Sequence, residues 1–115
     1  MKARQIVQTA KKAAEDKKGL DPVVLDLRKL SSVASYFLVV HGTSDRHVKT
    51  IAEHIVHILD DHDEAVWHLE GLRDGRWVVL DYGDVVIHVF HYETRQFYNL
   101  ERLWGAPTTR KHHAR

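Results

Sequence analysis

Apolar residues recur at three- and four-residue steps in two stretches of the chain, a spacing typical of amphipathic helices. In residues 2–18, alanine and aliphatic residues share one stripe, and lysines occupy other positions. The second and clearer stretch carries apolar residues from Val48 to Leu59 and ends near His62. Thr43 or Ser44 can accept hydrogen bonds from its first amides. The pattern therefore predicts two helices, each with one buried face.

Short apolar runs between and after these helices predict strands. The runs cover residues 23–27, 36–41, 65–70, 76–81 and 85–91. The first run is almost entirely apolar, as expected of a central strand, and the first two strands lack a long crossover, so we expect them to be antiparallel. The last two are separated only by Tyr82-Gly83-Asp84, which predicts an antiparallel hairpin.

The order of these elements predicts an α/β fold of the mixed (α+β) type, with a single mixed five-stranded sheet and helices packed on it. A short helix or turn within residues 94–104 is expected to lay its apolar residues on the sheet. Nothing in the sequence divides the chain, so one domain is predicted over residues 1–105. Residues 106–115 are polar and basic, and they are predicted to form a disordered tail.

The composition is that of an ordinary soluble protein, with 43% apolar and 29% charged residues in a chain of 115. There is no cysteine, which excludes a disulfide framework and a thiolate zinc site. The first residues run into a charged amphipathic pattern without an apolar signal core, and no run approaches the ~20 apolar residues of a membrane span. We therefore predict a cytoplasmic protein with no membrane partner.

Charge is balanced in total but uneven along the chain. The 17 basic and 16 acidic residues give a net charge of +1, which indicates no strong affinity for nucleic acid. Basic residues gather in residues 2–18 and 110–115, whereas acidic residues concentrate in residues 60–84. An acidic middle would suit a basic partner, and the basic ends could contact phosphate weakly. The alternative is that both are solvated surface charge.

The segment Gly42-Thr43-Ser44-Asp45 is a candidate anion site because it lies between a predicted strand and a predicted helix. A strand, Gly-Ser and a helix also begin the nucleotidyltransferase arrangement, whose later carboxylates bind magnesium; here these would be Asp81 and Asp84. The two acids lack the Asp-x-Asp alternation on one strand, and no phosphate-binding loop with Gly-Lys is present. A helix cap explains the same residues, so a nucleotidyl or phosphoryl transferase using Ser44, Asp81 and Asp84 remains the alternative function.

Histidine is abundant, with ten residues in the chain, but its spacing does not indicate a metal centre. His54 and His57 lie on the polar face of the second helix, where another element would have to approach to complete a ligand set. His88 and His91 point to opposite faces of a strand. No serine stands in a nucleophile-elbow sequence. We therefore predict no metal, no cofactor and no catalytic residue.

The last hairpin carries more than aliphatic residues. On its first strand Trp77, Val79 and Asp81 share one face, and Leu80 and Tyr82 share the other. If helices cover the aliphatic face, Trp77 and Asp81 stand on the opposite face of the sheet. Aromatic residues commonly anchor interfaces, and arginine is a common opposing group. The alternative is that Trp77 belongs to the core, beneath the C-terminal segment.

Several segments together resemble the ribosomal silencing factor family, also called the RsfS or Iojap family. The resemblance covers residues 3 to 105 and is carried by Leu30-Ser31-Ser32, Ser35-Tyr36-Phe37, Gly42-Thr43-Ser44-Asp45-Arg46, Glu70-Gly71, Gly75 to Val86, His88-Val89-Phe90 and Thr94 to Gly105. The long middle segment is the most specific of these. The tail after Gly105 has no counterpart in the family.

The resemblance implies a binding protein with a nucleotidyltransferase-like fold that lacks the catalytic carboxylate pattern. Members of the family attach to the large ribosomal subunit through its L-fourteen protein and hinder the joining of the small subunit, which lowers translation when nutrients are scarce. The resemblance also implies a homodimer when the protein is free, and the basic segments allow peripheral contact with ribosomal RNA. The partner-binding residues that it implies are Trp77, Leu80, Asp81, Tyr82, Asp84, His88 and Glu70.

Overall fold

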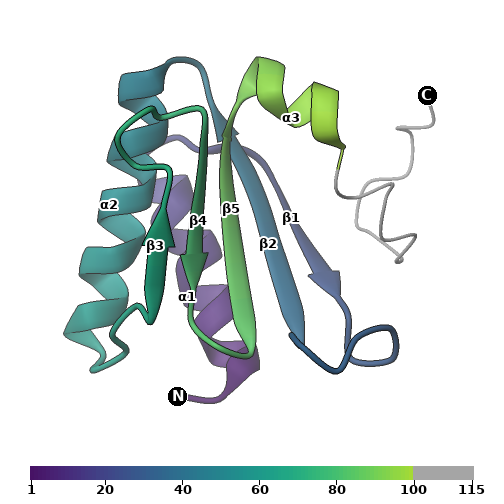
Figure 1. The fold of residues 1–115 in the computed structure, drawn as a ribbon. Coiled ribbons are helices and arrows are strands. Elements are labelled where there is room, and N and C mark those ends of the chain that lie inside the picture. The colour runs from purple at the N-terminus through teal and green to yellow at the C-terminus, as the bar shows by residue number, and fades with distance from the viewer. Residues whose placement is uncertain (100–115) are drawn as a thin grey trace.

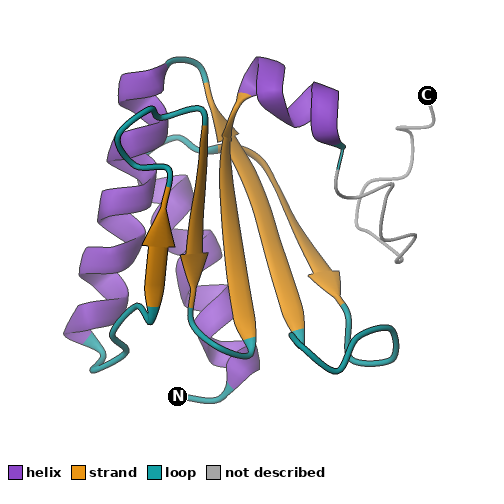
Figure 2. Cartoon of the chain, viewed as in Figure 1, coloured by secondary structure: helices purple, strands orange, loops and turns teal. Residues whose placement is uncertain are grey.

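The strands form one mixed sheet, and helices α1 and α2 lie on one of its faces (Figures 1 and 2). The computed structural model describes residues 1–99, apart from the side chains of Phe97 and Tyr98. Its elements are α1 (Ala3–Asp16), β1 (Leu20–Asp26), β2 (Tyr36–Gly42), α2 (Asp45–Asp61), β3 (His68–Glu70), β4 (Trp77–Asp81), β5 (Val85–His91) and α3 (Tyr92–Tyr98). The predicted order of elements and the five-stranded mixed sheet are confirmed.

The sheet has the strand order β1-β2-β5-β4-β3, with β5 at its centre. Strands β2 and β5 are parallel, and every other neighbouring pair is antiparallel. The antiparallel pairing of β1 with β2 and the hairpin of β4 with β5 were both predicted and are confirmed. One row across the sheet pairs Val39 of β2 with His88 of β5, and His88 with Val79 of β4.

Each of the two long helices buries the stripe that its sequence predicts. The buried residues are Ile6, Val7, Ala10, Ala13 and Ala14 on α1, and Val48, Ile51, Ala52, Ile55 and Leu59 on α2. They pack against one face of the sheet, where Leu38, Leu80 and Ile87 are fully buried. This cluster is the main core of the protein.

A smaller apolar cluster lies on the other face of the sheet. Its buried members are Val23, Leu25, Leu27, Val39 and Phe90, and Phe37 and Trp77 pack against it. The prediction that β1 is a central strand is wrong, because β1 lies at the edge of the sheet. The strand is rich in apolar residues because both of its faces are covered: Val24 packs on the main core, and its neighbours pack on the second cluster.

Several boundaries also differ from the expected ones; β1, for example, begins at Leu20 rather than at Val23. Strand β3 covers only His68–Glu70, because the chain bends before it and leaves Trp67 exposed. Helix α3 begins at Tyr92 rather than at Thr94, because Nδ1 of His91 accepts a hydrogen bond from the Glu93 amide at 3.2 Å and caps the helix. The C-terminal part of the predicted helix and the predicted tail lie outside the described residues. In the described part of the chain, no helix has the length and apolar character to span a membrane.

The start of α2 follows the predicted capping pattern. The Ser44 hydroxyl oxygen accepts a hydrogen bond from the His47 amide at 3.1 Å, and Asp45 lies in the first turn. Both contacts favour the amino-terminal end of the helix, where amides lack partners and the dipole is positive.

Loss of the Ser44 hydroxyl should therefore lower the stability of the protein. We expect Ser44→Ala to reduce the free energy of unfolding by about 1 kcal/mol, measured by urea denaturation. Ser44→Asp retains a capping oxygen and should keep most of the stability. Equal losses in both variants would show that the hydroxyl does not act as a cap.

Candidate binding face

Residues of β4 alternate between the two faces of the sheet. Val78 and Leu80 are fully buried beneath the helices, whereas Trp77, Val79 and Asp81 lie on the opposite face and are partly exposed. We call this opposite face the front face, because it is turned toward the viewer in Figure 1. The predicted division of β4 into a buried and an accessible set is therefore confirmed.

Trp77 is held in place by a cluster of rings on the front face. Its Nε1 donates a hydrogen bond to Nδ1 of His88 at 3.1 Å, and its ring centroid lies 5.0 Å from that of Phe90. The Phe37 ring meets His88 edge-on, with centroids 4.7 Å apart. Trp77 therefore packs on the second cluster and keeps part of its surface exposed, and most of the C-terminal segment named in the core alternative lies outside the described residues.

His88 is buried as a neutral imidazole. Its Nδ1 accepts the hydrogen bond from Trp77, so the ring proton resides on Nε2. Burial lowers the pKa of His88 from 6.5 to about 4. Within the described residues, Nε2 has no hydrogen-bond partner. His88 thus orients the Trp77 indole through this hydrogen bond, and little of the His88 surface is available for direct contact with a partner.

Asp81 shapes the turn between β4 and β5. Its Oδ1 accepts a hydrogen bond from the Gly83 amide at 2.8 Å, and Gly83 has a positive φ of 86°. This geometry favours glycine, because a Cβ atom there would be strained. The side chain of Asp84 is exposed next to it, and its backbone oxygen accepts hydrogen bonds from the Ser35 and Tyr36 amides. Both carboxylates therefore belong to one tight turn.

Glu70 extends the acidic character of the front face to the edge strand β3. Glu70 pairs with Val79 in the ladder, so its side chain lies on the same face as Trp77 and Asp81. It is exposed, and its Oε2 lies 2.5 Å from Nε2 of His68. The structure thus brings together four residues of the predicted set, Glu70, Trp77, Asp81 and His88, with Asp84 at the adjoining turn.

Leu80 and Tyr82 do not lie on this surface. Leu80 is fully buried and Tyr82 is 5% exposed, and both pack in the main core beneath the helices. Burial, with smaller contributions from Asp60 and Glu64, raises the pKa of Tyr82 to about 12. The resemblance assigned these residues to the same surface as Trp77, but the alternation of side chains along a strand places them behind it.

Trp67 is an exposed aromatic residue that the sequence analysis did not single out. Its side chain is 76% exposed, and its ring lies against Gly83 at the end of the β4–β5 hairpin. Its amide donates a hydrogen bond to the Asp81 carbonyl at 2.8 Å. The alternating pattern of residues 65–70 would place Trp67 on the same side as the partly buried Leu69. The chain instead bends at Trp67, before β3 begins at His68. The exposure of Trp67 could therefore have been predicted only if the start of β3 had been known.

The residues of the alternative enzyme hypothesis are at opposite ends of the sheet. Ser44 follows the end of β2, where Gly42 pairs with His91, whereas Asp81 pairs with Val86 at the far end of β5. The five residue steps of extended strand from Val86 to His91 span about 16 Å. Asp81 and the neighbouring turn therefore cannot act on a group held at the Ser44 helix cap.

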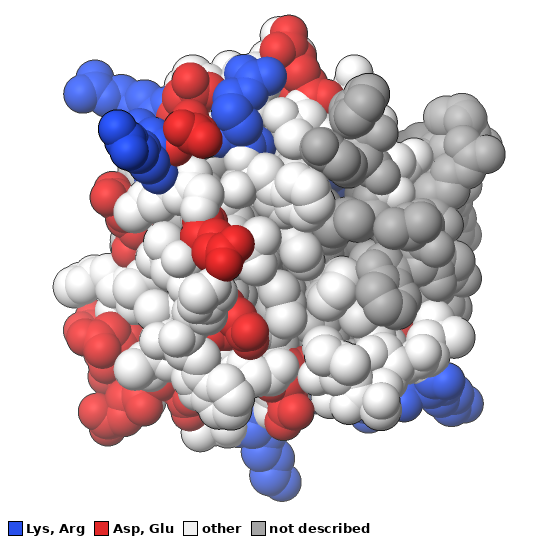
Figure 3. Space-filling view, in the orientation of Figure 1, with Lys and Arg blue, Asp and Glu red and all other residues white. Residues whose placement is uncertain are grey.

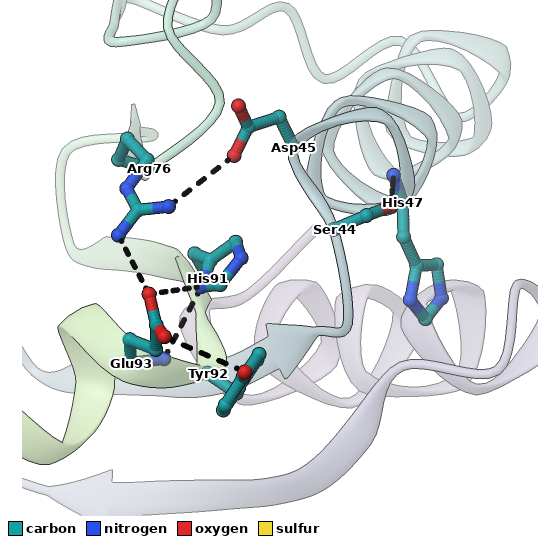
Figure 4. Close-up of polar contacts among 7 residues, drawn as sticks. All are labelled: Ser44, Asp45, His47, Arg76, His91, Tyr92 and Glu93. Carbon is teal, nitrogen blue, oxygen red and sulfur yellow. Dashed lines mark hydrogen bonds and ion pairs between the residues drawn. The ribbon is translucent and has the colours of Figure 1, made fainter.

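A separate polar cluster occupies the Ser44 end of the sheet (Figure 4). Arg76 contacts Asp45 at 3.6 Å and Glu93 at 3.2 Å, and so connects the loop before β4 to the starts of α2 and α3. The Tyr92 and His91 rings stack beside it with centroids 4.7 Å apart. The charged side chains pair with one another and the two rings stack, and these contacts hold α3 against the end of the sheet.

Charge is distributed unevenly over the front face (Figure 3). Acidic side chains gather on the side of β3 and β4 and near the end of α2, while lysine and arginine side chains project at the rim. On the front face the ladder places Glu70 and Asp81, with the exposed Asp84 at the adjoining turn, and Asp60 and Asp61 lie at the end of α2. The predicted concentration of acidic residues in residues 60–84 therefore produces an acidic region on the side of β3 and at the Asp81 end of β4, whereas Trp77 begins the same strand at its other end.

Comparison with known proteins gives the family. The model of the family described as "Ribosomal silencing factor during starvation" matches residues 1–114. The chain belongs to this family. A ribosomal silencing factor of Bacillus subtilis is 45% identical over 105 residues, which cover 91% of this chain and 89% of the relative.

Solved structures agree with this assignment. A crystal structure of a protein from Chromobacterium violaceum is 37% identical, covers 93% of this chain and 89% of its own, and has a TM-score of 0.89. A second, from Bacillus halodurans, is 38% identical, covers 94% and 99%, and has a TM-score of 0.82. The resemblance in the sequence and the mixed α/β fold are thus both confirmed.

The family is named for ribosomal silencing and not for a catalysed reaction. Among residues 1–99, no three histidine, aspartate or glutamate side chains come together to hold a metal ion. Histidines of this part of the chain instead form pairs with single acids, such as His57 with Asp61 at 3.6 Å. The front face itself carries apolar, aromatic and acidic side chains.

The placement of Leu80 can be tested by comparing it with its neighbour on the same strand. Leu80→Ala removes a fully buried side chain and should lower the free energy of unfolding by about 2–5 kcal/mol in urea denaturation. Val79→Ala, on the partly exposed front face, should cost clearly less. A larger loss for Val79→Ala would reverse the assignment of the two faces.

The buried neutral state of His88 should make stability depend on pH. The unfolded chain binds a proton at His88 below about pH 6.5, whereas the folded chain resists it until about pH 4. The contribution of His88 to the free energy of unfolding is therefore fully present above pH 6.5. It should be lost as the pH decreases to 4, which lowers the free energy of unfolding by up to about 3 kcal/mol. His88→Gln, whose amide oxygen can still accept from Trp77, should show a shallower slope when urea denaturation is repeated across this range. Parallel slopes would contradict the buried neutral state.

Proposed function

We propose that this chain silences ribosomes by binding the large ribosomal subunit through its L-fourteen protein and hindering the joining of the small subunit. Translation would then fall when nutrients are limiting. Membership of the ribosomal silencing factor family supports the ribosomal role. The single observation that carries the binding mode is the partly exposed Trp77, fixed by His88 on a sheet face rich in acidic residues.

The proposed contact surface consists of the accessible members of the predicted set. Trp77 is the anchor, because a rigid indole loses little freedom when it is buried by a partner. Glu70 and Asp81 supply negative charge on the same face, with Asp84 at the adjoining turn, which favours a basic partner and speeds the encounter. His88 acts by positioning Trp77. Leu80 and Tyr82 support β4 from the main core.

Two further partners belong to the same proposal. The front face that binds the ribosomal protein is also suited to self-association, so we infer a homodimer in the free state. Lysine residues on the exposed surface of α1 allow a weak, peripheral contact with ribosomal RNA phosphates. The site of action would be the cytoplasm, where free subunits are available.

The experiment that tests the function is co-sedimentation of the purified protein with separated large and small ribosomal subunits. Selective pelleting with the large subunit, together with reduced subunit joining in a light-scattering assay, would support silencing. A lack of association with either subunit would refute the ribosomal proposal.

Within that assay, substitutions on the front face should weaken binding without unfolding the protein. We expect Trp77→Ala to lower the affinity for the large subunit by about 30-fold or more, as for a central interface anchor. Asp81→Lys should weaken binding as well, because it reverses the local charge. Circular dichroism and thermal unfolding would establish that each variant is folded.

Two control variants separate charge from structure in this test. Asp81→Asn keeps an oxygen that can accept from the Gly83 amide, so it should preserve the turn and lose only the charge contribution. Asp74→Lys reverses an exposed charge in the loop before β4, away from the turn, and should have little effect. Unchanged affinity in both Trp77→Ala and Asp81→Lys would show that the front face is not the contact surface.

A further inference from the structure

Trp67 has the largest exposed fraction of any aromatic side chain whose exposure is described in residues 1–99. It is 76% exposed, compared with 44% for Tyr92. The ring is nevertheless held in position, because the six-membered part of the indole lies directly on Gly83, where a Cβ atom would approach it to 2.9 Å. The Trp67 amide is fixed to the Asp81 carbonyl at 2.8 Å. The indole is therefore an ordered surface, with one side on the turn and the remainder available to a partner.

The same turn that contacts the indole also carries two carboxylates, those of Asp81 and Asp84. Gly83 contacts the Trp67 ring, and its amide donates to Oδ1 of Asp81 at 2.8 Å. Asp84 follows directly and is exposed, and its carboxylate has no hydrogen bond or ion pair to the described residues. Gly83 thus contacts both the aromatic ring and the Asp81 carboxylate, and the next residue in the chain carries a second, exposed carboxylate.

The surroundings of this turn are negative. Asp60 at the end of α2 is close enough to raise the pKa of Tyr82, the residue before Gly83. Figure 3 shows acidic side chains over this end of the molecule, with a basic side chain at its lower rim. A cation that approaches Trp67 is therefore attracted before it makes contact.

We propose that Trp67, Asp81 and Asp84 form a receptor for an arginine side chain of the protein partner. This inference rests on the proposed function, because it names the chemistry by which the same partner is recognised beyond the Trp77 region. The guanidinium plane stacks on the exposed indole, and its N–H groups donate to the carboxylates at the turn.

Arginine fits this arrangement better than lysine. A guanidinium is planar and stacks on aromatic rings, and it can donate to a carboxylate while it does so. An ammonium group concentrates its charge in one strongly hydrated point and cannot stack. Because Gly83 already orders the indole and the Asp81 carboxylate, little side-chain freedom is lost on binding.

The first test measures the affinity of the full-length protein for isolated large ribosomal subunits by titrated co-sedimentation. We expect Trp67→Ala to weaken binding about tenfold, with a smaller effect for Asp84→Asn. The fold-loss of affinity in the Trp67→Ala, Asp84→Asn double variant should be smaller than the product of the two single fold-losses, because both groups contact one guanidinium. Tyr92→Ala, an exposed aromatic residue at the other end of the sheet, is the matched control and should bind normally.

The outcomes distinguish this inference from the function on which it rests. Normal binding by Trp67→Ala, with weakened binding by Trp77→Ala, would overturn the arginine receptor and leave the ribosomal proposal standing. Weaker self-association of Trp67→Ala in sedimentation velocity, with normal subunit binding, would also overturn it and would assign Trp67 to a second copy of the chain. Failure of the unaltered protein to bind subunits would refute the proposed function.

A second measurement tests the receptor without ribosomes. The ¹⁵N-labelled protein is titrated with N-acetyl-arginine amide and, in parallel, with N-acetyl-lysine amide, and the indole N–H of Trp67 is assigned by its loss in Trp67→Ala. We expect a concentration-dependent shift of this signal with the arginine probe, at least threefold larger than with the lysine probe and reduced in Asp84→Asn. Equal shifts with both probes, or no shift, would overturn the proposal.

Discussion

The parallel pairing of β2 with β5 is the constraint on which the rest of the structure depends. All residues from Tyr36 to Gly42 pair in register with those from Val85 to His91. Two parallel strands require a crossover, and here the intervening chain supplies α2 on one face and strands β3 and β4 beyond β5. Because α1 packs beside α2 on that same face, β4 has one side in the core and presents the other at the front. Which residues can meet a partner is thus decided by this pairing.

Stability and the proposed recognition are coupled at the front face, because the same side chains would contribute to both. Trp77 packs on Phe90 and donates to His88, and Asp81 holds the Gly83 turn while it carries charge. The proposed contact surface is built on β4, which pairs with β3 on one side and with the central strand β5 on the other, so it would be rigid before a partner arrives and association would cost little conformational entropy. The consequence is that a substitution such as Asp81→Lys disturbs the turn as well as the charge.

The sequence was sufficient wherever a local pattern determines the outcome. Helical stripes, the Ser44 cap and the alternation of Trp77 and Leu80 follow from residue spacing, and the structure agrees with them. It was insufficient wherever the outcome depends on distant segments. The apolar sequence of β1 predicted a central strand, but the strand is apolar because both of its faces are covered. The exposure of Trp67 depends on where β3 begins. The separation of Ser44 from Asp81 depends on strand direction.

The spacing of the aromatic groups indicates the size of partner that the proposed contact surface would need. Trp77 begins β4 and Asp81 ends it, with Trp67 beside the turn that follows. A strand of this length separates its ends by about 14 Å, so no single small molecule contacts both the Trp77 cluster and the turn. Their combined use requires an extended, folded surface, as in protein interfaces of ordinary size. The acidic residues near the turn would then set the register of the partner, and Trp77 would supply most of the binding energy.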